Sequence, residues 1–357
     1  MWAVPDRGLT VSAAQQTDLS DGARDLDVEL LDELPAVAPL IAKATLRARG
    51  RPGSLGGLPG RRVLTTGVHV RADRLAGYTH LCGMSLRNQV PATYLHVLTF
   101  PLQVHLMAAR DFPYAMAGMV HVANTMTLHR PVEIGETLTL SSSAADVRAH
   151  HRGVTVDLLG RAEVGAETVW EGTSTYLVRG AEAPSATQGS SPGAPSSDLS
   201  PGDRSDDDPP QDEAADEGAA PGSPSLSSWA RWRLPADLGR RYAAVSGDVN
   251  PIHLNPLAAK AFGFPRTIAH GMWTHARVLG ALQGRLQDRH TVTVDFRKPV
   301  LLPSTVDFSA SRGDHGWRFG VTGKDGERVH LTGTVEAPRA GIISRAEDDF
   351  THEGRVV

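Results

Sequence analysis

Apolar and polar residues follow two periodicities in the second half of the chain. Apolar residues recur at the spacing of one helix face in residues 271–286, and a shorter helical pattern occupies residues 238–246. Alternation of apolar and polar residues, which is typical of strands, follows further along the chain. The pattern predicts two helices and then four strands, at residues 291–296, 304–311, 316–323 and 328–335.

The first half of the chain shows the same order of patterns. An apolar segment at 95–109 predicts a helix that Pro101 limits or kinks, because proline removes a backbone hydrogen bond inside a helix. One buried helix followed by consecutive antiparallel strands is typical of an α+β domain whose sheet wraps the helix. The predicted strands lie around residues 117–128, 136–147, 152–159 and 166–178.

Two pairs of segments resemble each other across the halves. LHRPVEIGETLTL at 128–140 and FRKPVLLPSTVDF at 296–308 share a basic residue, Pro-Val, a turn and an alternating strand. YTHLCG at 78–83 matches YAAVSG at 242–247 in spacing and residue type. The offsets of 168 and 164 residues far exceed the period of a solenoid, roughly 20–50 residues. We therefore expect two copies of one domain.

Composition marks a boundary between the copies. Residues 181–227 hold ten acidic residues and one basic residue among Ala, Pro, Ser and Gly. Such a segment buries too little apolar surface to offset its ordering entropy, so we expect a disordered acidic linker; an acidic interaction tail is the alternative. The expected organisation is an N-terminal extension (1–60), a first domain (61–180), the linker (181–227), a second domain (228–337) and a C-terminal tail (338–357).

The overall composition excludes several classes of protein. The 357 residues are 40% apolar, which suits two domains with their own cores. A net charge of −4 disfavours nucleic-acid binding, and no apolar stretch approaches the roughly 20 residues that cross a bilayer. The single cysteine, Cys82, excludes an intramolecular disulfide and a multi-cysteine metal site. With no signal-peptide pattern at the start, we expect a cytoplasmic protein.

The candidate chemistry is concentrated in SGDVNPIHLNP, where Asp248, Asn250 and His253 fall within six positions. The neighbouring Gly247 and Pro251 favour an irregular turn on which these side chains can converge. A carboxylate and an imidazole that converge can act as a general acid–base pair, because burial and mutual charge tune both pKa values. Asn250 can donate to the carboxylate or position a water. The alternative is an ordinary structural turn.

The comparison of the two copies favours the chemical interpretation. At an offset of 164, the three polar residues correspond to Met84, Leu86 and Gln89 in the first copy. A purely structural turn could have kept its polar residues in both copies. We therefore expect one competent site and one degenerate site.

The string SGDVNPIHLNP, followed by AHGM at 269–272, resembles the signature of the MaoC-like (R)-specific enoyl-thioester hydratases and 3-hydroxyacyl-thioester dehydratases. The chain resembles the double-hotdog, actinobacterial type over roughly residues 60–180 and 228–337. The resemblance implies an α+β double hotdog, in which two hotdog domains, each a long helix wrapped by an antiparallel sheet, pair as a pseudo-dimer. It does not cover the acidic linker.

The resemblance also implies a reaction, the reversible hydration of trans-2-enoyl thioesters to (3R)-hydroxyacyl thioesters in fatty-acid metabolism. Asp248 and His253 are the implied catalytic pair, with Asn250 in support. The backbone N–H of Gly271 is the implied donor to the thioester oxygen, which agrees with its place near the start of a predicted helix. The implied substrate-binding residues are His270, for which a structural role is an equal alternative, and Met272.

The implied substrate is an acyl thioester of coenzyme A or of acyl carrier protein, and acyl carrier protein is a possible partner. Proton transfer and water suffice for the reaction, so we expect no cofactor and no metal. The first copy is expected to be non-catalytic and to accommodate the acyl chain, with Met84, Leu86 and Gln89 in an apolar wall. Candidates for contacts with coenzyme A phosphates or an acidic carrier, if they are not simply solvated, are Arg297, Lys298, Arg130 and the basic region 43–62.

Two other functions remain open from the residues alone. A hotdog acyl-thioester hydrolase uses the same fold, and fold does not decide function. A non-catalytic acyl-thioester binding protein would bind without turnover. The assembly is expected to be a monomeric pseudo-dimer or a homodimer.

Overall fold

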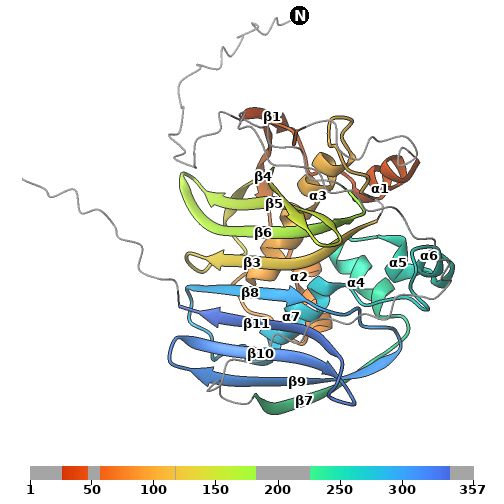
Figure 1. Cartoon of the computed structure of the whole chain (residues 1–357). Coiled ribbons are helices and arrows are strands. Elements are labelled where there is room, and N and C mark those ends of the chain that lie inside the picture. Colours follow the sequence, from red (N-terminus) through yellow and green to blue (C-terminus); the bar gives the residue numbers. More distant parts are fainter. Residues whose placement is uncertain (1–25, 47–56, 117, 182–225, 338–357) are drawn as a thin grey trace, which may run out of the picture.

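A single sheet of eleven strands forms the framework of the computed structural model (Figure 1), which describes residues 26–46, 57–116, 118–181 and 226–337. The strands are β1 (Asp27–Leu31), β2 (Arg61–His69), β3 (Met119–Leu128), β4 (Thr137–His150), β5 (Gly153–Val164), β6 (Glu167–Arg179), β7 (Ser227–Leu234), β8 (His290–Phe296), β9 (Ser304–Gly313), β10 (Gly316–Gly323) and β11 (Val329–Glu336). Their order across the sheet is β1-β2-β4-β5-β6-β3-β8-β11-β10-β9-β7.

The helices supply the second layer. The longest helix contacts five strands of the first half, and Figure 1 shows the central helices behind the sheet. None of the helices in the described ranges is long and apolar enough to cross a membrane. The helices are α1 (Val37–Leu46), α2 (Ala72–Cys82), α3 (Ala92–Ala108), α4 (Leu238–Ser246), α5 (Pro251–Leu254), α6 (Pro256–Ala261) and α7 (Gly271–Leu282).

The two halves are related by an approximate two-fold axis at the centre of the sheet. There β3 of the first half pairs antiparallel with β8 of the second, and the strand order then runs outwards through equivalent strands on both sides. Helices α2 and α4 both end at a glycine with positive φ, Gly83 and Gly247, and pack on each other. Each half is therefore a long helix wrapped by an antiparallel sheet. The predicted α+β double hotdog is confirmed.

The apolar patterns locate strands β3–β6 and β8–β11 and helices α3, α4 and α7, but they do not predict β2, β7, α2, α5 or α6. Two of the predicted helices also differ from expectation. Helix α3 runs unbroken through Pro101, because its side chains are buried almost all round and tertiary packing outweighs the lost hydrogen bond. Helix α7 ends at Leu282, before the predicted end at 286.

The N-terminal extension holds two elements that the sequence did not predict. Strand β1 pairs with β2 in parallel, at one edge of the sheet. Helix α1 packs on α3, and its buried residues Val37, Ile41 and Ala44 cover the end of the first half. The predicted linker lies outside the described residues except at its two ends, and the predicted tail 338–357 lies wholly outside them.

The two halves differ in one connection. This connection joins α2 to α3 in the first half and α4 to α7 in the second half. In the first half, residues 84–91 lead directly into α3 without a helix. In the second half, residues 248–270 form a longer excursion that contains α5 and α6. This excursion carries the residues of the predicted site.

Candidate active site

The excursion begins where α4 is forced to stop. Gly247 adopts a φ of 76°, a conformation that side chains disfavour, and its N–H bonds to the carbonyl of Ala243. Ser246 then fixes the next residue, because its Oγ donates to the Tyr242 carbonyl at 2.8 Å and accepts from the Asp248 N–H at 3.2 Å. The backbone that carries Asp248 is therefore anchored to the last turn of α4.

Asn250 has a structural task that its position explains. Its Oδ1 accepts from the Ile252 N–H at 3.4 Å, so it caps α5, and Pro251 occupies the first helical position, where proline is favoured. Its own N–H donates to Oδ1 of Asp248 at 3.1 Å. The sequence predicted an irregular turn here; the structure has a capped one-turn helix, which directs His253 inward.

His253 presents one ring nitrogen for chemistry. Its Nδ1 lies 2.9 Å from the carbonyl of Ile268, and a carbonyl can only accept, so Nδ1 carries the proton in the neutral ring. The other nitrogen, Nε2, is then an unprotonated acceptor. His253 is buried and borders the main cavity, so this tautomer suits a general base.

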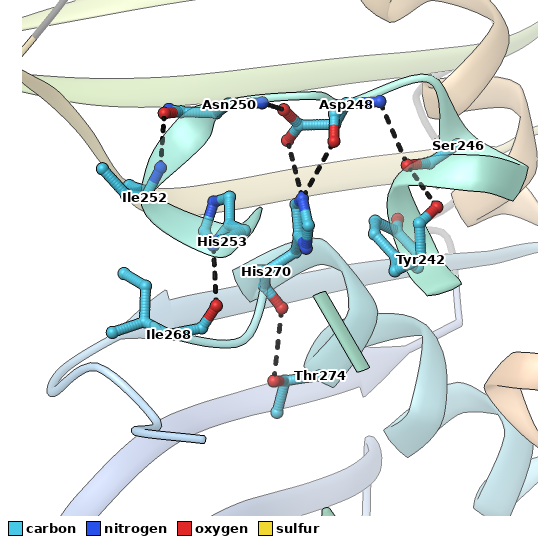
Figure 2. Close-up of polar contacts among 9 residues, drawn as sticks. All are labelled: Tyr242, Ser246, Asp248, Asn250, Ile252, His253, Ile268, His270 and Thr274. Carbon is cyan, nitrogen blue, oxygen red and sulfur yellow. Dashed lines mark hydrogen bonds and ion pairs between the residues drawn. The ribbon is translucent and has the colours of Figure 1, made fainter. Parts of the chain in front are cut away.

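His270 links the two predicted catalytic residues (Figure 2). Its Nε2 donates to the backbone carbonyl of Asp248 at 3.1 Å and lies 3.7 Å from Oδ2 of the same residue. The ring of His270 stacks on that of His253 with centroids 3.7 Å apart. Only 2% of His270 is exposed. Its hydrogen bond to Asp248 and its stacking on His253 therefore fix the positions of both residues.

Burial shifts the pKa values of this pair toward each other. Burial raises the pKa of the Asp248 carboxyl, and the nearby His253 charge opposes that shift only in part. Burial likewise lowers the pKa of His253, against the opposing effect of Asp248. The pKa of His270 is lowered well below its usual value by burial and by His253. A carboxyl that can hold a proton thus faces an imidazole that can lack one.

Gly271 lies at the first position of α7, beside the pair. The first N–H groups of a helix have no acceptor within it, and the helix dipole favours negative charge there. A Cβ at this position would lie 3.0 Å from two ring atoms of Phe296, so glycine lets that ring pack against the start of the helix. The position can therefore offer a backbone donor to an anionic oxygen.

A cavity of about 490 Å³ opens in front of these groups, within the size range of small-molecule sites. The five residues proposed from the sequence around 248–271, together with Met272, all border it. Nearly half of the wall comes from the first half of the chain, including α1, α3, β3 and β6. The polar wall residues that sequence reasoning missed there include His96, His121 and Tyr176, although a buried histidine in the apolar run of α3 is a usable signal.

One expectation about individual residues is wrong. Met84, Leu86 and Gln89 do not border this cavity: Leu86 is 57% exposed, and Gln89 forms a β-bridge with Glu133. The reason is that residues 84–91 are too short to build an equivalent of the second-half excursion.

The basic residues divide into two groups. Arg130 does not border the cavity, and it forms ion pairs with Glu136 and Glu167 at 2.8 Å each. Arg297 and Lys298 are exposed and do border the cavity. Of the region 43–62, residues 47–56 lie outside the described residues. Arg297 and Lys298 are thus placed where a charged carrier of the substrate could meet them.

One group of potential metal ligands occurs in the described ranges, and it is the same site. One donor atom each from Asp248, His253 and His270 lie within 4.8 Å of one another. Two ring nitrogens of the histidines are already bonded to backbone carbonyls. Each histidine therefore keeps one ring nitrogen, Nε2 of His253 and Nδ1 of His270, that is not bonded to these carbonyls.

Comparisons with known proteins agree with this geometry. Residues 219–333 match the MaoC like domain, and residues 75–166 match the FAS1-like dehydratase domain region. The chain is 37% identical over 278 residues to 3-hydroxyacyl-thioester dehydratase X of Mycobacterium tuberculosis, covering 78% of this chain and 90% of that protein.

Solved structures show the same likeness. The crystal structure of HtdX from Mycobacterium tuberculosis has a TM-score of 0.62 and 33% identity, over 78% of this chain and all of that one. A MaoC-like dehydratase from Phytophthora capsici has a TM-score of 0.60 over 79% of this chain and 96% of that one, and at 18% identity shows the fold alone. The chain belongs to the MaoC-like dehydratase family, in its double-hotdog form.

Proposed function

We propose that this chain is a hydro-lyase that catalyses the reversible hydration of trans-2-enoyl thioesters to (3R)-hydroxyacyl thioesters. The observation that carries the proposal is the convergence of Asp248, His253 and the N-terminus of α7 on one cavity. Family membership supports the same reaction class, since the relative in Mycobacterium tuberculosis is a 3-hydroxyacyl-thioester dehydratase. The substrate is a thioester of coenzyme A or acyl carrier protein.

The reaction needs one water, two proton transfers and a site for negative charge. In hydration, the Asp248–His253 pair holds the water, removes one of its protons as oxygen bonds to the β carbon, and serves proton delivery to the α carbon. Dehydration reverses these steps: the α proton leaves and the departing hydroxyl is protonated. Burial raises the pKa of Asp248 and lowers that of His253, and both shifts reduce the difference between the proton affinities of the two groups.

The carbonyl oxygen of the thioester gains negative charge when water attacks the β carbon or when the α carbon is deprotonated. The N–H of Gly271, with the dipole of α7 behind it, is the donor we assign to that oxygen. Asn250 and His270 act as positioning residues, the first through the cap of α5 and the second through its bond to the Asp248 carbonyl. The cationic Arg297 and Lys298 can contact phosphates of the carrier.

The reaction is tested with purified protein and crotonyl-CoA, together with a longer trans-2-enoyl-CoA. We expect loss of the enoyl absorbance, (3R)-hydroxyacyl-CoA as the product, and no release of free thiol. Release of free coenzyme A without a hydroxyacyl product would support the hydrolase alternative. Binding without any turnover, with acyl carrier protein substrates also inert, would support the non-catalytic alternative.

A further inference from the structure

The cavity extends from the reacting centre into the first half of the chain through a continuous row of rings. Phe296 packs against the start of α7 at Gly271, and its ring centroid lies 5.0 Å from that of His121. His121 in turn stacks parallel to His96 of α3, at 6.2 Å and 18°. The row leads from the proposed oxyanion donor to the buried face of α3.

From His96 onwards, one face of α3 forms the wall. Val97, Phe100, Val104 and Met107 all border the cavity, at the three- and four-residue spacing that places side chains on one side of a helix. Ten residues separate the first from the last, which corresponds to about 15 Å along the helix axis. The wall is apolar over this length, so it suits an alkyl chain.

Helix α1 stands at the far end of this wall. Ile41 borders the cavity, is 9% exposed and belongs to the same apolar cluster as Val104 and Met107. Thr45, one turn further along α1, also borders the cavity but is exposed, as is Arg179 at the end of β6. The apolar lining therefore gives way to polar residues at α1.

We propose that helix α1 of the N-terminal extension determines the acyl-chain length that this enzyme accepts, with Ile41 as the specificity-determining residue. The inference rests on the proposed hydratase function. An extended chain advances about 1.2 Å per bond, so the wall of about 15 Å accommodates roughly twelve carbons in addition to those that span the row of rings. Substrates of about sixteen carbons extend along this wall towards Ile41, whereas those of four or eight carbons end before it.

The test compares kcat/KM for trans-2-enoyl-CoA substrates of four, eight and sixteen carbons. We expect wild type to use the sixteen-carbon substrate well. Ile41→Trp places a ring at the end of the wall, where it would clash with the last carbons of the sixteen-carbon chain. Such a clash costs at least as much binding free energy as the loss of one methylene contact, so kcat/KM for that substrate should fall by about tenfold or more. The two shorter substrates should change by less than about twofold, since uniform binding near the reacting carbons is untouched.

A matched control adds the same ring outside the cavity. Ala42 follows Ile41 on α1, is exposed and does not border the cavity, so Ala42→Trp should leave all three substrates unchanged. Should Ile41→Trp fail to fold, Ile41→Ala and Thr45→Trp test the same wall. Ile41→Ala should raise kcat/KM for chains longer than sixteen carbons, and Thr45→Trp should lower it.

The outcomes separate this proposal from the function on which it rests. If wild type hydrates all three substrates, and Ile41→Trp and its substitutes change kcat/KM equally for each of them, the role of α1 is overturned and the hydratase function stays intact. A wild type that accepts only short chains would do the same. No hydration at any length would instead contradict the proposed function itself.

Discussion

Protonation of one buried histidine should lower the free energy of unfolding of this protein. His275 lies on α7 at the centre of the molecule, is 0% exposed, and neither of its ring nitrogens has a hydrogen-bond partner among the described residues. Burial, with smaller effects of His96 and His290, lowers its pKa to about 3. The unfolded chain binds this proton near the ordinary value of about 6.5.

The direction of the effect follows from linkage. Between pH 6.5 and about 3 the unfolded state binds a proton at His275 that the folded state does not, so stability falls as the pH falls through this range. At pH 5 the pKa of the unfolded group lies about 1.5 units above the pH, which gives a loss of about 2 kcal/mol. His96, with its pKa lowered to about 4 by burial, adds a similar loss.

The assay is urea unfolding of wild type and His275→Leu at about pH 7.5 and pH 5. Leucine has a similar volume and no titratable group, so the variant should lose about 2 kcal/mol less than wild type on acidification. The exposed His315→Gln serves as a control that should behave as wild type. An equal acid loss in wild type and His275→Leu would refute the reasoning.

Four further outcomes are expected. Asn250→Ala removes the cap of α5 and should lower the free energy of unfolding by about 1 kcal/mol in a urea titration, together with kcat, while Asn250→Ser restores the cap. Gly271→Ala sets a methyl group 3.0 Å from a phenyl ring beside the proposed oxyanion donor, so kcat should fall by about tenfold while circular dichroism stays unchanged. Because burial lowers the pKa of His253 and protonation there removes the base, the acid limb of kcat/KM should lie below pH about 6.5; a midpoint above pH 7 would contradict this. Arg130→Ala breaks surface ion pairs worth less than about 1 kcal/mol and should leave steady-state kinetics unchanged.

The fold could be predicted where it depends on the local pattern of apolar and polar residues. The strands of the second half alternate in burial as their sequences alternate in polarity, so the predicted ranges differ by only a few residues from β8 to β11. The motif around Asp248 is compact in sequence, and Gly247 and Pro251 already indicate its turn chemistry. Those features depend on neighbours along the chain, which a sequence displays directly.

The missing features depend on contacts between distant segments. Helix α1 owes its place to packing on α3, and its own pattern is short and flanked by polar residues. His121 and Tyr176 reach the cavity because β3 and β6 pair at the centre of the sheet, which no local pattern reveals. The constant offset between copies also fails beyond Gly83, because the excursion at 248–270 exists in one half only. Asp248, which the offset of 164 residues pairs with Met84, therefore has no structural equivalent in the first half.

The proposed pair in the second half is tested most directly by hydration of crotonyl-CoA with wild type, Asp248→Asn and His253→Ala measured side by side. The exposed residues Asp314 and His151 provide matched controls through Asp314→Asn and His151→Ala. We expect (3R)-hydroxybutyryl-CoA from wild type and both controls, and a loss of activity of about 100-fold or more in each site variant. Folded Asp248→Asn or His253→Ala protein that retains activity within about twofold of wild type would contradict the assignment of this pair.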